Sequence, residues 1–157
     1  GGHRAERQKV SVNAELQGRS YPPAQPYAVG REAIIDFAHA VKATHPLHLD
    51  VEAARAAGHA DVVAPPTFAV LISQRAEGAY IQDSESGIDF SRVVHADERF
   101  THHRPIVAGD LITATVTVDR ARAVGTGGMV TTRTELVDAA GEPVTTVFST
   151  LLVRGED

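Results

Sequence analysis

Four successive segments with apolar residues at every second position make up the chain from residue 92 to residue 154. The second segment shows the pattern most clearly, because Ile112, Ala114 and Val116 are separated by single threonines. Breaks rich in glycine or proline lie between the segments, which are residues 92–103, 110–124, 128–139 and 143–154. A period of two is typical of strands with one buried face, and short breaks join antiparallel neighbours. The sequence therefore predicts an antiparallel meander of four strands.

The residues before this meander show helical spacing in place of alternation. Helices are predicted over residues 31–42, 52–57 and 65–80. The third helix opens on a proline pair, which the first helical turn tolerates, and its only ionic residues are Arg75 and Glu77. We expect the sheet to cover this helix along Phe68, Leu71, Ile72 and Ala76. With a fifth strand near residues 27–29, helices followed by a strand meander define an α+β fold.

The composition indicates the broad class of protein and argues against several functions. At 157 residues, 43% of them hydrophobic, the chain is long enough for one domain with a substantial core. It contains no cysteine, and it has no apolar run long enough to cross a membrane. A net charge of -5 without basic clusters argues against nucleic acid as a partner. We expect a cytoplasmic protein with no membrane or nucleic-acid partner, in which residues 11–157 form a single domain and residues 1–10 are a cloning remnant or disordered tail.

The loop between the first two predicted helices holds the densest group of titratable side chains. His45 and His48 stand three residues apart around Pro46, which stiffens the loop. Imidazoles titrate near neutral pH, so the pair suits general acid–base catalysis, although a polar surface loop has the same composition. Metal binding is the other alternative, with His102 or His103 as an added ligand, but neighbours on a strand face opposite ways and only one of these two would join. Because the sequence supplies no clear third ligand, we expect no metal and no cofactor.

Motifs for nucleophilic catalysis and phosphate binding are absent from the sequence. Ser73 lies within the third predicted helix, without a Gly-x-Ser-x-Gly elbow. Residues 125–128 are glycine-rich but join two strands, so they predict a hairpin turn. The start of the third helix is a candidate binding feature, because free N–H groups and the helix dipole there stabilise developing negative charge on a thioester oxygen.

Taken in chain order, four groups of residues resemble the MaoC-like (R)-specific hydratase and dehydratase family, which has the hot-dog fold. The groups are residues 31–41, His45-Pro46-Leu47-His48, residues 58–68 with Ala64-Pro65-Pro66-Thr67-Phe68 at their end, and Arg104-Pro105-Ile106-Val107-Ala108-Gly109-Asp110. The last two runs are most similar to small actinobacterial proteins related to the non-catalytic, substrate-binding subunit of (3R)-hydroxyacyl-ACP dehydratase. The resemblance, which extends from about residue 21 to residue 153, implies a single hot-dog domain with an antiparallel sheet wrapped around a central helix.

The same resemblance identifies candidate site residues and two departures from the family pattern. In active members, a loop of the form Asp-x-Asn-Pro-x-His carries the catalytic groups, and a glycine N–H at the start of the central helix binds the thioester carbonyl. Here His48 takes the histidine position, but His45 replaces the asparagine and Ala43 replaces the aspartate. Pro66, which has no N–H, stands at the glycine position. The candidate catalytic residues are His48 and His45, and the resemblance assigns substrate binding to Pro66, Thr67, Phe68, Leu71 and Ile72.

These departures leave three functional hypotheses. The first is a dehydratase-related subunit that binds an acyl-ACP or acyl-CoA thioester and needs a catalytic hot-dog partner. The second is a self-sufficient homodimeric (R)-specific enoyl hydratase that uses His48. The third is an acyl-thioester-binding protein without enzymatic activity. Because a single sheet leaves open edges, we expect either a homodimer or a heterodimer of hot-dog subunits.

Overall fold

A curled antiparallel sheet forms the body of the protein. The computed structural model describes residues 11–155, so residues 1–10, interpreted above as a remnant or tail, lie outside the described residues together with residues 156–157. The five strands are β1 (Tyr27–Ala28), β2 (Val93–His102), β3 (Leu111–Val124), β4 (Gly127–Val137) and β5 (Pro143–Val153). They lie in the order β1-β3-β4-β5-β2, and every neighbouring pair is antiparallel.

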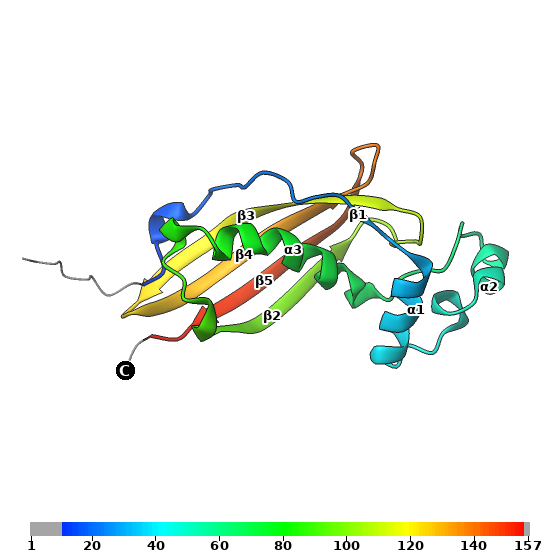
Figure 1. Ribbon diagram of the computed structural model, residues 1–157, viewed down its shortest axis with the longest axis horizontal. Coiled ribbons are helices and arrows are strands. Elements are labelled where there is room, and N and C mark those ends of the chain that lie inside the picture. The colour runs from blue at the N-terminus through cyan, green and yellow to red at the C-terminus, as the bar shows by residue number, and fades with distance from the viewer. Residues whose placement is uncertain (1–10, 156–157) are drawn as a thin grey trace, which may run out of the picture.

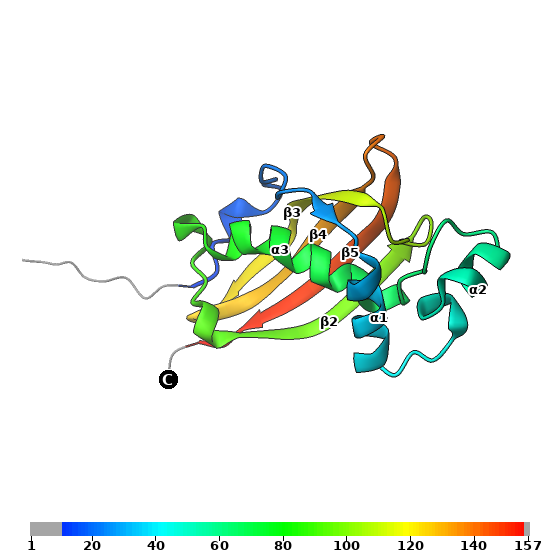
Figure 2. The same ribbon diagram turned by 45° about the vertical axis from the view of Figure 1, so that its right-hand side comes forward.

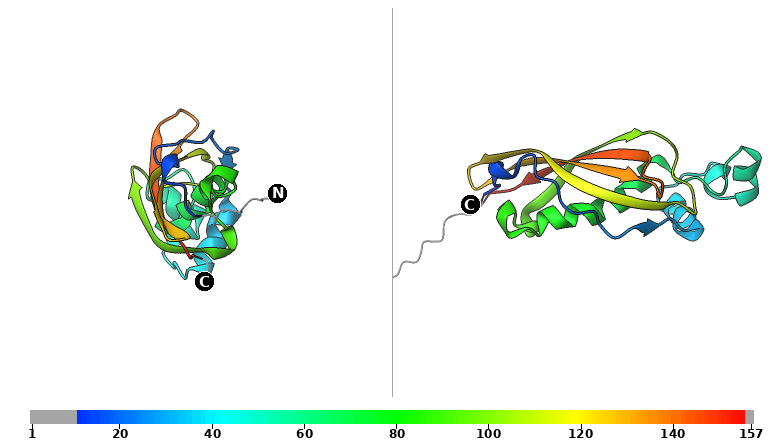
Figure 3. Two further views of the ribbon diagram at one scale, coloured as in Figure 1. Left: turned by 90° about the vertical axis from the view of Figure 1, so that its left-hand side faces the viewer. Right: turned by 90° about the horizontal axis from the view of Figure 1, so that it is seen from above.

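One long helix occupies the inner face of this sheet. The helix α3 (Ala69–Ile81) follows a 3-10 turn at Pro66–Phe68 and lies along the sheet, whose strands curl around it (Figures 1 and 3). The shorter helices α1 (Arg31–Ala40) and α2 (Val51–Ala56) lie beyond one end of the sheet (Figure 2). This arrangement confirms the predicted α+β hot-dog fold. The four long strands and the helices α1 and α2 begin and end within two residues of their predicted limits, whereas α3 begins four residues later than predicted, after the 3-10 turn.

The core lies between α3 and the apolar face of β3. Alternate residues of β3, the predicted Ile112, Ala114, Val116 and Val118, are all at most 2% exposed. From the helical side, Phe68 and Ile72 are 0% and 1% exposed and belong to the same cluster. Phe68 also meets the ring of Phe37 edge-on, with 5.4 Å between the ring centroids. This contact ties α1 to the core and fixes the start of the central helix.

Leu71 does not belong to this core, and its predicted burial was wrong. Its side chain is exposed, at 38%. The buried positions of the helix come in adjacent pairs one turn apart: residues 68 and 69, 72 and 73, 76 and 77, 80 and 81. At 100° per residue, Leu71 points to the opposite side of the helix from the centre of that stripe. The helix therefore buries Glu77 against the sheet, whereas Leu71 faces away from it.

The strand β2 forms a long free edge of the sheet. It pairs with β5 on one side and has no other strand partner among the described residues. The opposite edge is covered by the two-residue strand β1 and by the segment before it. No helix within residues 11–155 is long and apolar enough to cross a membrane. Alternate residues along the ten of β2 leave their backbone groups open to a further strand, which suits edge-to-edge assembly into dimers.

The different environments of neighbouring residues on α3 can be tested by truncation. Ile72→Ala should lower the free energy of unfolding by about 2–5 kcal/mol, because it leaves a cavity in a packed core. Leu71→Ala removes the same type of side chain from an exposed position and should cost less than about 1 kcal/mol. Urea denaturation of both variants measures the difference. Equal losses would contradict the placement of the two residues.

Candidate functional site

A cavity lies where β2 ends, between the 3-10 turn Pro46–His48 and the start of the central helix. Its volume is about 500 Å³. The residues that line it are His48, Val63, Ala64, Pro66, His102, His103, Arg104, Pro105 and Ile106. The imidazole rings of His48, His102 and His103 thus line one cavity. Among the residues that the structure describes, no carboxylate lines it. The cavity brings together the histidine loop, the proline-rich helix start and the Arg104–Asp110 segment, which lie far apart in the sequence.

His48 is held in this cavity by a hydrogen bond of its ring and by a backbone hydrogen bond of the residue before it. The peptide carbonyl of Val63 accepts a hydrogen bond from Nδ1 of His48 at 2.6 Å. In return, the N–H of Val63 donates to the carbonyl of Leu47 at 2.8 Å. Because a carbonyl can only accept, Nδ1 carries the proton, and the neutral ring presents Nε2 as an acceptor. Nε2 has no hydrogen-bond partner among the described residues, so His48 can accept a proton from a molecule in the cavity.

His45 has a structural contact and does not line the cavity. Its Nδ1 accepts the N–H of Leu47 at 3.1 Å and so caps the 3-10 turn that carries His48. The two rings are 6.1 Å apart between centroids and inclined by 67°. His45 therefore orients the loop, while its predicted part in the chemistry stays a prediction.

His102 and His103 both line the cavity, although alternation predicted that only one would join a site. His103 follows the last residue of β2, where strict alternation ends. The rings bond different residues of β5: His102 Nδ1 lies 3.2 Å from Thr145 Oγ1, and His103 Nε2 lies 3.4 Å from Thr146 Oγ1. Burial lowers the pKa of His102 below its usual value, and the charge of His103 lowers this pKa further. The two threonines gave no sequence signal, because only the register of β2 on β5 brings them to the histidines.

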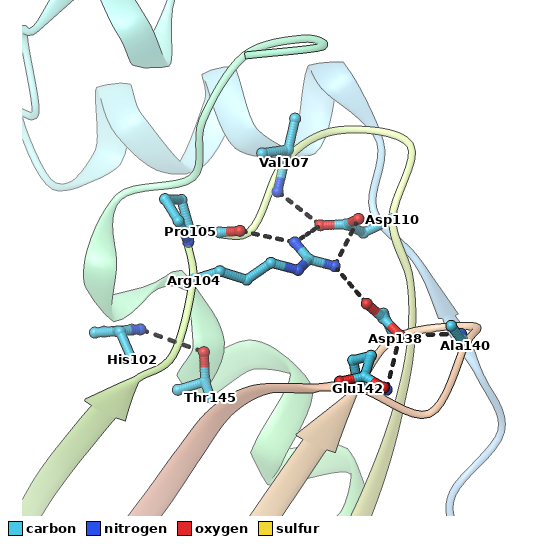
Figure 4. Close-up of polar contacts among 9 residues, drawn as sticks. All are labelled: His102, Arg104, Pro105, Val107, Asp110, Asp138, Ala140, Glu142 and Thr145. Carbon is cyan, nitrogen blue, oxygen red and sulfur yellow. Dashed lines mark hydrogen bonds and ion pairs between the residues drawn. The ribbon is translucent and has the colours of Figure 1, made fainter. Parts of the chain in front are cut away.

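Arg104 belongs to a clamp that shapes the wall of the cavity (Figure 4). Its guanidinium bonds both carboxylate oxygens of Asp110, at 2.9 and 3.1 Å, and reaches Asp138 at 3.3 Å. Asp110 also accepts the N–H of Val107 at 2.9 Å, which closes the loop between β2 and β3. Two carboxylates thus compensate the charge of Arg104. The Arg-Pro-Ile-Val-Ala-Gly-Asp run acts here as a structural clamp that holds buried Ile106 against the cavity.

The predicted substrate-binding residues lie in three different environments. Pro66 lines the cavity, and Thr67 beside it is exposed at the start of the 3-10 turn. Phe68 and Ile72 lie buried in the core behind this wall, whereas Leu71 faces away. The first backbone N–H after the proline pair belongs to Thr67. No group of three or more His, Asp or Glu side chains within residues 11–155 is placed to hold a metal ion.

Comparison with known proteins identifies relatives of the whole domain. Residues 15–147 match the family model of the FAS1-like dehydratase domain region. The UPF0336 proteins of Leifsonia xyli subsp. xyli and Clavibacter michiganensis subsp. michiganensis are each 55% identical over 148 residues, which is 94% of this chain and 99% of each relative.

Solved structures give the same result for the fold. A MaoC-like dehydratase superposes with a TM-score of 0.82 at 32% identity, over 90% of this chain and 43% of that longer chain. The HadBC (3R-hydroxyacyl-ACP dehydratase) complex from Mycobacterium tuberculosis superposes with a TM-score of 0.77 at 31% identity, over 87% of this chain and 96% of the matched chain. The curled sheet and the central helix are thus those of a MaoC-like hot-dog protein. The chain belongs to the FAS1-like dehydratase-region family, with actinobacterial UPF0336 proteins as its homologues.

The coupling between His102 and His103 gives a direct test of the cavity's electrostatics. Replacing His103 by Gln removes the neighbouring positive charge, so the pKa of His102 should rise. It should stay below the usual histidine value, because burial, the larger cause, is unchanged. NMR titration of the His102 ring in both proteins measures the shift. A His102 pKa that does not move, or that falls, would contradict the placement of the two rings.

Proposed function

We propose that this chain is the substrate-binding subunit of a (3R)-hydroxyacyl thioester dehydratase and works with a catalytic hot-dog partner. Its substrate is an acyl thioester of ACP or CoA, and we propose a cytoplasmic location with it. The observation that carries the proposal is the chemistry of the cavity wall, which offers histidines but no carboxylate among the described residues. Ala43 provides none from the loop, and Pro66 provides no N–H at the helix start.

Dehydration of a 3-hydroxyacyl thioester needs two proton-transfer groups and a stabilised oxygen. The C2–H and C3–O bonds break, the C2=C3 double bond forms, and water leaves. A base must take the C2 proton, and an acid must protonate the departing hydroxyl. Loss of one group of such a pair costs a large part of about 10² to 10⁴ in rate. Loss of an oxyanion donor costs about 3 kcal/mol of transition-state stabilisation. His48 without these partners is poorly equipped for turnover.

A partner subunit can supply the missing groups, and the fold leaves room for one. The HadBC structure that this chain resembles is a complex. On this chain, the free β2 edge offers ten residues for pairing with a second sheet. In the proposed complex this subunit shelters the acyl chain beside Phe68 and Ile72. Leu71, on the outer side of α3, has no place in that path.

A second candidate function is a self-sufficient homodimeric hydratase. The anchored Nδ1 of His48 favours it, because it leaves Nε2 as a free acceptor inside the cavity. One histidine could then serve as the base in one direction and the acid in the other. The two functions differ in whether the chain has activity alone, and in whether that activity depends on His48.

Activity measurements separate these functions. The purified chain should hydrate crotonyl-CoA far more slowly than the kcat of about 10 s⁻¹ typical of enzymes, since it lacks the carboxylate and the N–H. Co-expression with a MaoC-like subunit that carries an Asp-x-Asn-Pro-x-His loop should give an active complex. His48→Ala in this chain should leave the rate of the complex unchanged.

The matched control is His39→Ala, which removes an exposed histidine at the end of α1. If His48→Ala silences the complex while His39→Ala does not, this subunit contributes acid–base chemistry and the non-catalytic assignment fails. Fast turnover by the chain alone, abolished by His48→Ala, would establish the homodimeric hydratase instead.

A further inference from the structure

The inner face of the hot-dog carries one buried and one half-buried carboxylate on the side of α3 that faces β2. Glu77 is 1% exposed, and its Oε2 accepts the hydroxyl of Thr132 at 2.8 Å. Its other oxygen lies 3.7 Å from Nε2 of His95, an edge-strand residue. Glu77 and His95 line a cavity of about 430 Å³ that is separate from the one containing His48.

Glu98, three residues further along β2, extends this acidic group. Its Oε1 accepts the hydroxyl of Ser149 at 2.9 Å, while its Oε2 is buried without a hydrogen-bond partner among the described residues. Burial raises the pKa of Glu98, and the nearby charge of Glu77 raises it further. A buried carboxylate oxygen without a donor is destabilising unless another group reaches it.

Within residues 11–155, no cation apart from His95 forms an ion pair with Glu77 or Glu98. Arg99, the next basic residue of β2, lies on the other face of the sheet, where its guanidinium stacks 4.4 Å above the ring of Phe148. Phe90, which lines the same cavity as Glu77 and His95, is 69% exposed. An exposed aromatic ring beside carboxylates that have no arginine or lysine partner is typical of an interface with a cationic counterpart.

Self-pairing of this edge would bring the carboxylates together. If β2 (Val93–His102) pairs antiparallel with a second copy along nearly its whole length, the twofold axis passes at one of its two central residues, Asp97 or Glu98, because directly opposite side chains lie on the same face of the sheet. The carboxylate on the axis would then lie directly opposite the same carboxylate of the other copy. Like charges opposite each other are destabilising, and inward-pointing charges on edge strands prevent self-association.

We propose that Glu77 and Glu98 make the β2 edge selective for a different hot-dog subunit, one whose own edge presents an Arg or Lys side chain to these carboxylates. This deepens the proposed function, on which it rests, because it names the chemistry of the partner's edge. Of the two assemblies that the sequence left open, it favours the heterodimer. The self-association of the chain is correspondingly weak at neutral pH.

Self-association of the chain alone tests the repulsion. Glu98→Gln keeps the shape of the side chain and the acceptor for Ser149 but removes the charge. It should lower the dissociation constant of the homodimer by about tenfold or more at pH 7.5, as sedimentation velocity over a micromolar concentration series measures. Glu15→Gln, an exposed carboxamide substitution beside β3 at the far side of the sheet, is the charge-matched control and should have no effect. An unchanged or higher dissociation constant for Glu98→Gln would overturn the proposal.

Binding of a partner tests the cation. With the co-expressed subunit that carries an intact Asp-x-Asn-Pro-x-His loop, Glu98→Lys should weaken the complex about tenfold or more, and Glu15→Lys should not. Equal affinity of the two variants would overturn the claim of a cationic partner edge. If the wild-type chain forms no complex with that subunit, the proposed function fails together with this partner. The self-association measurement still decides whether Glu98 opposes the homodimer, so the two failures are distinguishable.

Discussion

The packing of α3 against β3 is the contact on which the other features of the molecule depend. Buried Phe68 and Ile72 face the apolar residues of β3, and this face is apolar because every second residue of the strand is Ile, Ala or Val. The contact fixes the rotation of the helix about its axis. With that rotation set, Leu71 must face outward and Glu77 must face the remaining strands. This packing therefore sets the position of both the histidine cavity at the start of α3 and the carboxylate of Glu77 further along the helix.

The histidine cavity is positioned by a second set of contacts, which are polar. The ring of His48 is hydrogen-bonded to the carbonyl of Val63. The segment around Val63 is in turn bonded to the loop after β2, because the N–H of Ala64 donates to the carbonyl of Ile106 at 2.8 Å. That loop is closed by Arg104 and Asp110 (Figure 4). The Arg-Pro-Ile-Val-Ala-Gly-Asp run, one of the two runs most similar to the family, therefore supports the wall of the cavity. Its charged residues compensate one another and are not available to a substrate.

Most of the architecture could be predicted from the sequence because it rests on local periodicity. Alternation in β3 and the proline pair before α3 both act over a few residues, and the predicted limits were close. The side on which Glu98 lies could not be predicted in this way. A bulge between His95 and Asp97 inserts Ala96 into β2, so that His95 and then Glu98 face inward while Asp97 faces outward. Without the bulge, Asp97 would have faced inward. A one-residue shift of register decides which charge is buried, and no local pattern reports it.

The division of α3 into an apolar and a polar side also limits the acyl chain that the proposed function would place there. From Phe68 the inner face of the helix is apolar through Ile72 and Ala76, apart from the small side chain of Ser73, and then meets Glu77. These nine residues span about 13 Å at a rise of 1.5 Å per residue. A methylene chain that continued past that point would contact the buried carboxylate of Glu77 and disturb its hydrogen bond with Thr132. Under the proposed function, the same Glu77 that belongs to the selective edge would also end the apolar path, so this subunit would favour acyl chains that stop before the middle of α3.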